Sequence, residues 1–74
     1  MSFQAYVNGQ KPKTKKALRE ALQTNPSAVW FEDTSITSRG NLTADEMSPS
    51  DVIVGPDVYT ARNWYANVKN GRVV

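Results

Sequence analysis

The sequence has 74 residues, a net charge of +2, and neither cysteine nor histidine. This length predicts a single small domain over 1–74 and leaves no room for an enzyme whose cleft lies between two lobes. The missing residue types exclude disulfides, thiol nucleophiles, Ser-His-Asp triads and ordinary zinc sites. We therefore expect no cofactor, no metal and no catalytic residues, and a small core that would gain stability from oligomerisation.

The chain opens with a period-two pattern, SFQAYVNG, which predicts a half-buried strand ended by Asn8-Gly9. The apolar positions Phe3, Ala5 and Val7 alternate with Gln4, Tyr6 and Asn8. An amphipathic helix is expected next, with Thr14 as N-cap and an end before Asn25-Pro26. Its apolar stripe consists of Leu18, Ala21 and Leu22.

A second strand is predicted in SAVWFED, residues 27–33, with Val29 and Phe31 on one face. Because strand, helix and strand follow one another within about 30 residues, we expect a right-handed crossover with the two strands parallel. The polar segment 33–50 is then long enough for a functional or mobile loop. Within it, Thr43 and Glu46 have capping-box spacing, which predicts a short helical turn.

The last third of the chain predicts strands separated by turns. DVIVG is a compact strand that a turn at Gly55-Pro56-Asp57 should close, and NWYANVK is the last long strand. Asn70-Gly71 predicts a type I′ hairpin that returns residues 72–74 as a short edge strand. The predicted fold class is α+β, a two-layer sandwich with one helix on a small mixed sheet, in the order β-α-β-β-β with a C-terminal hairpin.

Charge is segregated along the chain. Residues 11–20 carry a net charge of +4, residues 32–57 carry −5, and residues 58–74 carry +3. Such a chain could present a basic patch and an acidic loop on different faces and so steer a charged partner. The alternative is a solvated surface of mixed sign.

Four lysines and an arginine crowd the predicted helix start, where the helix dipole prefers anions. These cations are Lys11, Lys13, Lys15, Lys16 and Arg19. Their side chains could simply be hydrated surface groups, or they could form an anion site together with the free N–H groups of the helix. Combined with sheet aromatics, they would suit single-stranded nucleic acid, because cations follow phosphates and rings stack on bases.

If the helix covers the face that carries Phe3 and Phe31, the opposite face should present a few aromatic rings. The expected residues are Tyr6, Trp30 and Tyr65. This face could be a hydrated sheet surface or a contact surface for a partner or a second copy. As a third alternative, Trp30 could lie under the acidic loop in a secondary core.

Two stretches, YVNGQKPKTKKALREAL and VIVGPDVYTARNWYANV, resemble small proteins of unknown function encoded by bacteriophages of actinobacteria. The resemblance lies at the two ends of the chain and leaves the middle loop out. It implies expression in the cytoplasm of an infected host and action by binding a host or phage protein. It implies no functional residue.

Three functions stay open at this point. The first is a non-enzymatic module that binds a protein through the sheet aromatics or through loop 33–50. The second is a nucleic-acid binder that uses the basic helix start. The third is a homodimer formed by edge pairing of the C-terminal strand. We expect a cytoplasmic protein without a membrane segment, because no stretch resembles a signal peptide or a membrane span.

Overall fold

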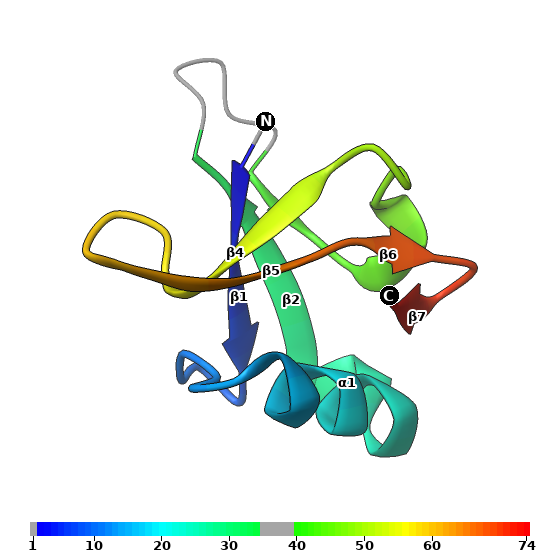
Figure 1. Cartoon of the computed structure of the whole chain (residues 1–74). Coiled ribbons are helices and arrows are strands. Elements are labelled where there is room, and N and C mark those ends of the chain that lie inside the picture. Colours follow the sequence, from blue (N-terminus) through cyan, green and yellow to red (C-terminus); the bar gives the residue numbers. More distant parts are fainter. Residues whose placement is uncertain (1, 35–39) are drawn as a thin grey trace.

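A computed structural model describes residues 2–34 and 40–74. It contains one α-helix, a five-stranded mixed sheet and a separate two-stranded sheet (Figure 1). The predicted α+β class, with a helix packed on a sheet, is confirmed.

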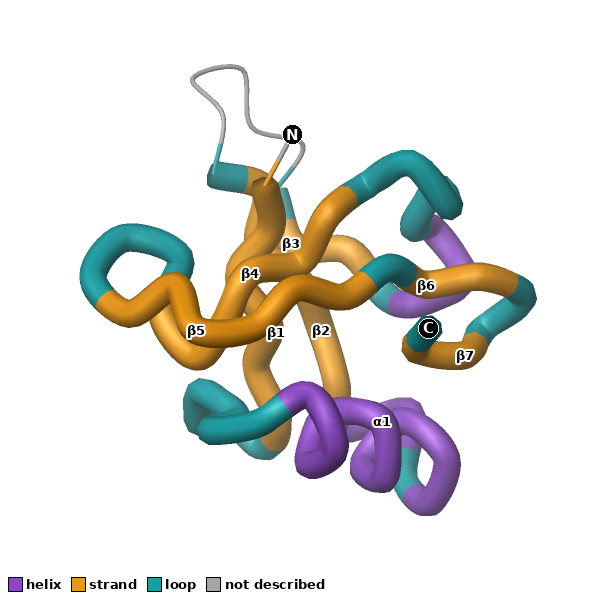
Figure 2. Tube along the Cα trace, viewed as in Figure 1, coloured by secondary structure: helices purple, strands orange, loops and turns teal. Residues whose placement is uncertain are grey.

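Figure 2 distinguishes the helices, strands and loops of the described residues. Their bounds are β1 (Ser2–Val7), α1 (Lys15–Thr24), η1 (Pro26–Ala28), β2 (Val29–Asp33), β3 (Asn41–Leu42), η2 (Ala44–Glu46), β4 (Val52–Asp57), β5 (Ala61–Ala66), β6 (Val68–Lys69) and β7 (Arg72–Val73). The large sheet has the order β3-β2-β1-β4-β5, and β6 and β7 form the small one. Only β1 and β4 pair in parallel; the other neighbours are antiparallel.

The prediction that the first two strands run parallel is wrong, because β1 and β2 are antiparallel neighbours. After β1 the chain turns tightly at residues 8–10, and α1 lies across the ends of β1 and β2 (Figure 1). The Asn8 N–H donates to the carbonyl of Ala28 at 2.9 Å, so the second strand begins where the first one ends. The helix therefore spans one end of the strand pair and does not form a crossover.

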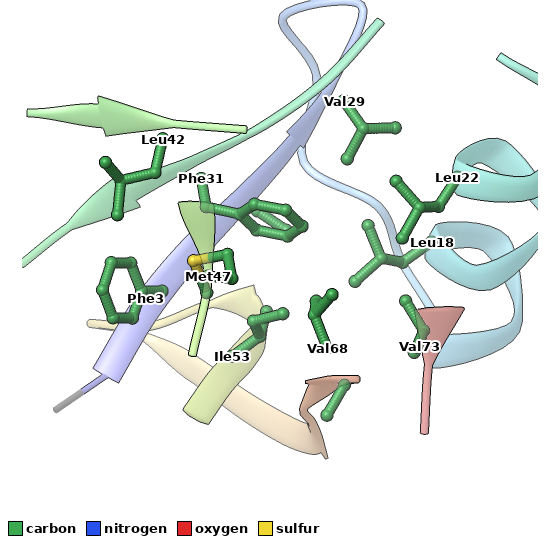
Figure 3. Packing of buried hydrophobic residues seen from close by; sticks show 12 residues of the cluster. Phe3, Leu18, Leu22, Val29, Phe31, Leu42, Met47, Ile53, Val68 and Val73 are labelled. Carbon is green, nitrogen blue, oxygen red and sulfur yellow. The ribbon is translucent and has the colours of Figure 1, made fainter. Parts of the chain in front are cut away.

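The helix itself forms as predicted. Thr14 is the N-cap, and its Oγ1 accepts a hydrogen bond from the N–H of Ala17 at 3.0 Å. Leu18 and Leu22 are buried in the core, while the remaining helix residues are exposed or partly buried. The core lies between the sheet, α1 and the hairpin (Figure 3). Its buried members are Phe3, Ala5, Leu18, Leu22, Val29, Phe31, Leu42, Met47, Ile53, Ala66, Val68 and Val73.

Part of the predicted loop 33–50 is regular structure. Residues 35–39 of this loop lie outside the described residues, but residues 41–46 form β3 and η2. The expected capping box is present, since the side chain of Glu46 accepts from the Thr43 N–H at 3.0 Å. In this segment β3 pairs with β2, and the side chains of Leu42 and Met47 are buried in the core. The alternative in which the acidic loop covers Trp30 stays a prediction.

The predicted turn at Gly55-Pro56-Asp57 is wrong, because β4 continues to Asp57. The peptide bond between Gly55 and Pro56 is cis, and the register with β5 shifts at the same place. Gly55 lies under the ring of Trp64, which would collide with any Cβ atom at this position. The chain turns only at residues 58–60.

The predicted last long strand is divided at Asn67 into β5 of the large sheet and β6 of the small one. The Asn67 Nδ2 group donates to the carbonyls of Pro49 and Asp51, and the Asn67 backbone pairs with Val74. The hairpin prediction is confirmed: Asn70 and Gly71 have φ values of 54° and 75°, as a type I′ turn requires.

Candidate functional site

Three aromatic residues lie on the sheet face that α1 does not cover. Tyr6 of β1 and Trp30 of β2 are directly paired, and both point away from the core because they alternate with buried residues such as Phe31. Tyr65 of β5 alternates with the core residue Ala66 and therefore points to the same side. We call the set of Tyr6, Trp30 and Tyr65 the aromatic face.

The centre of this face is a stacked pair of rings. The centroids of Tyr6 and Trp30 are 4.2 Å apart, with an angle of 16° between the ring planes. The Tyr6 hydroxyl donates to Oε1 of Glu32 at 3.3 Å. Burial, followed by the negative charge of Glu32, raises the pKa of the Tyr6 hydroxyl above its ordinary value. Both rings are held in place but only partly covered.

A small group of buried residues lies outside the main core. It consists of Gln4, Val54 and Val58, none of which belongs to the main core. The side chain of Gln4 is 2% exposed and joins β1 to the end of β4: Nε2 donates to the carbonyl of Pro56 at 2.8 Å, and Oε1 accepts from the Val58 N–H at 2.8 Å. Tyr65 is the cross-strand partner of Val54 and is 56% exposed.

Lys11 and Asp57 form an ion pair at the edge of the aromatic face. Lys11 Nζ lies 2.6 Å from Asp57 Oδ2. The hydrogen bond from Lys11, followed by that from the Tyr59 N–H, lowers the pKa of the Asp57 carboxyl to about 2. The same hydrogen bond raises the pKa of the Lys11 ammonium. Lys11 is therefore occupied by a partner from within the chain.

The other cations of the predicted anion patch lie elsewhere. Lys13 precedes α1, and Lys15, Lys16 and Arg19 belong to the helix, which lies at the end of β1 and β2 (Figure 1) and packs Leu18 and Leu22 into the main core. Of the predicted cations, the structure thus places Lys11 alone beside the predicted aromatics, and Lys11 is already paired with Asp57. A combined surface for single-stranded nucleic acid would need both cations and aromatic rings.

A hollow of about 400 Å³ lies beside the start of the helix. It is lined by Val7, Asn8, Gln10, Lys11, Pro12, Lys13 and Ala17. All of its polar side chains are exposed, which makes it a surface depression with no enclosed polar group to select a ligand.

A metal site and a membrane-spanning helix each place requirements on the described part of the chain. Residues 2–34 and 40–74 contain no group of three or more Asp and Glu side chains placed to hold a metal ion. No helix within these ranges has the length and apolar character needed to cross a membrane.

The homodimer hypothesis places its interface at the C-terminal strand. In the structure β7 pairs with β6 alone and packs against α1. It therefore lies at the edge of a two-residue ladder and not at the edge of the large sheet. Self-association through this strand stays a prediction.

Sequence reasoning found the three rings but missed what supports and surrounds them. Gln4 alternates with apolar residues and so reads as a solvent-facing residue, although it is buried. The ion pair of Lys11 with Asp57 joins residues that are 46 positions apart in the sequence, so no local sequence pattern predicts it. Comparison of the chain with protein-family models, with curated proteins and with solved structures gives no match.

Proposed function

We propose that the protein is a non-enzymatic binding module that contacts a protein partner through the aromatic face. The observation that carries this proposal is the stacked Tyr6–Trp30 pair together with the 56% exposed Tyr65 on one side of the sheet. Tyrosine and tryptophan are enriched at the centres of protein interfaces, where they bury a large area at a small cost in conformational entropy. Rings already held in place lower this cost further.

The charges around these rings favour a protein over a nucleic acid. Glu32 accepts from the Tyr6 hydroxyl, and Asp57 accepts from Lys11 at the edge of the face. Asp57 is neutralised by Lys11, but the Glu32 carboxylate beside the rings repels phosphates, whereas a protein partner can donate hydrogen bonds to Glu32 or place a cationic side chain over Trp30. Binding of single-stranded nucleic acid at this face is the weaker alternative.

The biological setting of this proposal rests on the resemblance to small bacteriophage proteins. On that basis we propose a host or phage protein as the partner and the host cytoplasm as the location.

The proposal is tested by affinity capture from a bacterial lysate, with the tagged protein as bait. Nuclease treatment and about 150 mM salt remove nucleic-acid bridges and screen weak surface attraction. We expect the wild-type protein to retain a protein in near-stoichiometric amount. The Tyr65→Ala variant should bind the captured protein at least tenfold more weakly than the wild type, because the substitution removes an exposed interface tyrosine without disturbing the core.

Tyr59→Ala provides the matched control. Tyr59 is 71% exposed but lies in the turn after β4 and not on the sheet. Its substitution should leave capture unchanged. Equal capture by the wild type and Tyr65→Ala, or equal loss in both variants, would rule out the aromatic face as the binding surface.

A further inference from the structure

Positive charge is concentrated in two elements that are far apart in sequence. The helix α1 contains Lys15, Lys16 and Arg19, and the β6–β7 hairpin contains Lys69 and Arg72. Against these five cations the two elements hold a single acidic residue, Glu20. Their combined net charge is therefore +4, whereas the rest of the chain has −2.

The fold joins these two elements into one surface. Strand β7 packs against α1, and Val73 lies in the core with Leu18 and Leu22 (Figure 3). Because Val73 points inward, Arg72 and its register partner Lys69 point outward, and both are exposed. The hairpin thus adds two cations to those of the helix, and we call this set of five residues the basic surface.

These five cations have no partner within the described part of the chain. Within residues 2–34 and 40–74 one ion pair is present, between Lys11 and Asp57, and it involves none of the five cations. The first turn of α1 also contains no acidic residue, although the dipole of the helix favours one there. The positive charge of this surface is therefore available to an external anion.

We propose that the basic surface binds the phosphate backbone of double-stranded DNA without reading its sequence. The five cations lie on a helix and an adjacent hairpin. Neither element contains an aromatic residue that could stack on bases. A duplex offers a regular array of phosphates and needs no stacking platform. The net charge of −2 on the remainder of the chain orients the protein with this surface toward the DNA. The inference goes beyond the proposed protein-binding function and uses a different surface.

The test is fluorescence anisotropy with a labelled DNA duplex of arbitrary sequence, long enough to cover the surface. If all five cations contact phosphates, the slope of log Kobs against log salt concentration should be about −4 to −5, since each contact contributes about −0.9. A triple variant, Lys15→Gln with Arg19→Gln and Arg72→Gln, should flatten the slope by about 2 to 3. Far-UV circular dichroism checks that the variant is folded.

Arg62→Gln is the matched control, because Arg62 is an exposed cation on β5, outside α1 and the hairpin. This variant should keep the wild-type slope. Absence of salt-dependent DNA binding, or an equal slope in the triple variant and the wild type, would overturn the inference. Binding to vesicles that contain phosphatidylserine without binding to DNA would overturn it as well. The variant Tyr65→Ala should bind DNA normally, so failure of this proposal is distinguishable from failure of the proposed protein-binding function.

Discussion

Gln4 is the residue that holds the aromatic face together. Strands β1 and β4 have only two register pairs, at Ser2 with Val52 and Phe3 with Ile53. Beyond these two pairs, the side-chain amide of Gln4 takes the place of backbone hydrogen bonds between the strands: it donates to the Pro56 carbonyl and accepts from the Val58 N–H. A side chain thus supplies the hydrogen bonds that the backbones no longer exchange.

We predict that Gln4→Leu lowers the free energy of unfolding by about 2–4 kcal/mol, because it leaves the buried Val58 N–H and the Pro56 carbonyl without their partner. Gln23→Leu is the control, since Gln23 is exposed on α1 and its substitution should change stability by less than about 0.5 kcal/mol. Urea unfolding of both variants measures the difference. Equal midpoints would show that the Gln4 hydrogen bonds do not stabilise the fold.

The helix α1 contains residues that stabilise it and cations that destabilise it. The Thr14 cap and the buried Leu18 and Leu22 stabilise it, whereas Lys15 and Lys16 face the positive end of its dipole. Lys15 is also one turn from Arg19, a like-charge pair. A sequence chosen only for stability would place acidic residues there, so the cations are consistent with a binding role.

Lys15→Glu should therefore stabilise the protein and weaken DNA binding at the same time. We expect a gain of about 1 kcal/mol, from a better dipole interaction and a new Glu–Arg pair with Arg19. The same change removes one phosphate contact and adds repulsion, so affinity for duplex DNA should fall at least tenfold. Gln23→Glu, in the last turn of α1, can form the same pair with Arg19 but lies at the unfavourable end of the dipole, so its gain in stability should be clearly smaller than that of Lys15→Glu, which separates the dipole effect from the ion pair. Thermal unfolding and anisotropy report the two effects, and a loss of stability in Lys15→Glu would contradict this account of α1.

Elements that depend on neighbouring residues were predictable from the sequence, whereas those set by distant contacts were not. The helix with its Thr14 cap, the turn at 43–46 and the Asn70-Gly71 hairpin all follow from local chemistry. The antiparallel pairing of β1 with β2 depends on where α1 docks, and the division at Asn67 depends on contacts with Pro49 and Asp51. For the same reason the aromatic rings were found from alternation, but the buried role of Gln4 was not.

The protein presents two surfaces of different chemistry. The aromatic face carries the Glu32 carboxylate beside its rings, whereas α1, at the end of the strand pair (Figure 1), presents the basic surface together with the hairpin. The segregation of charge seen along the sequence is thereby converted into two surfaces of one small protein. Such an arrangement would allow a protein partner and DNA to be held at the same time.

Hydrogen exchange with mass spectrometry tests this two-surface account most directly. The free protein is compared with the complex it forms with the captured protein, and with its complex with duplex DNA. The account predicts that the protein partner protects amides of β1, β2 and β5 around Tyr6, Trp30 and Tyr65, whereas DNA protects those of α1 and the β6–β7 hairpin. Protection of α1 by the protein partner, with the aromatic face unchanged, would contradict it.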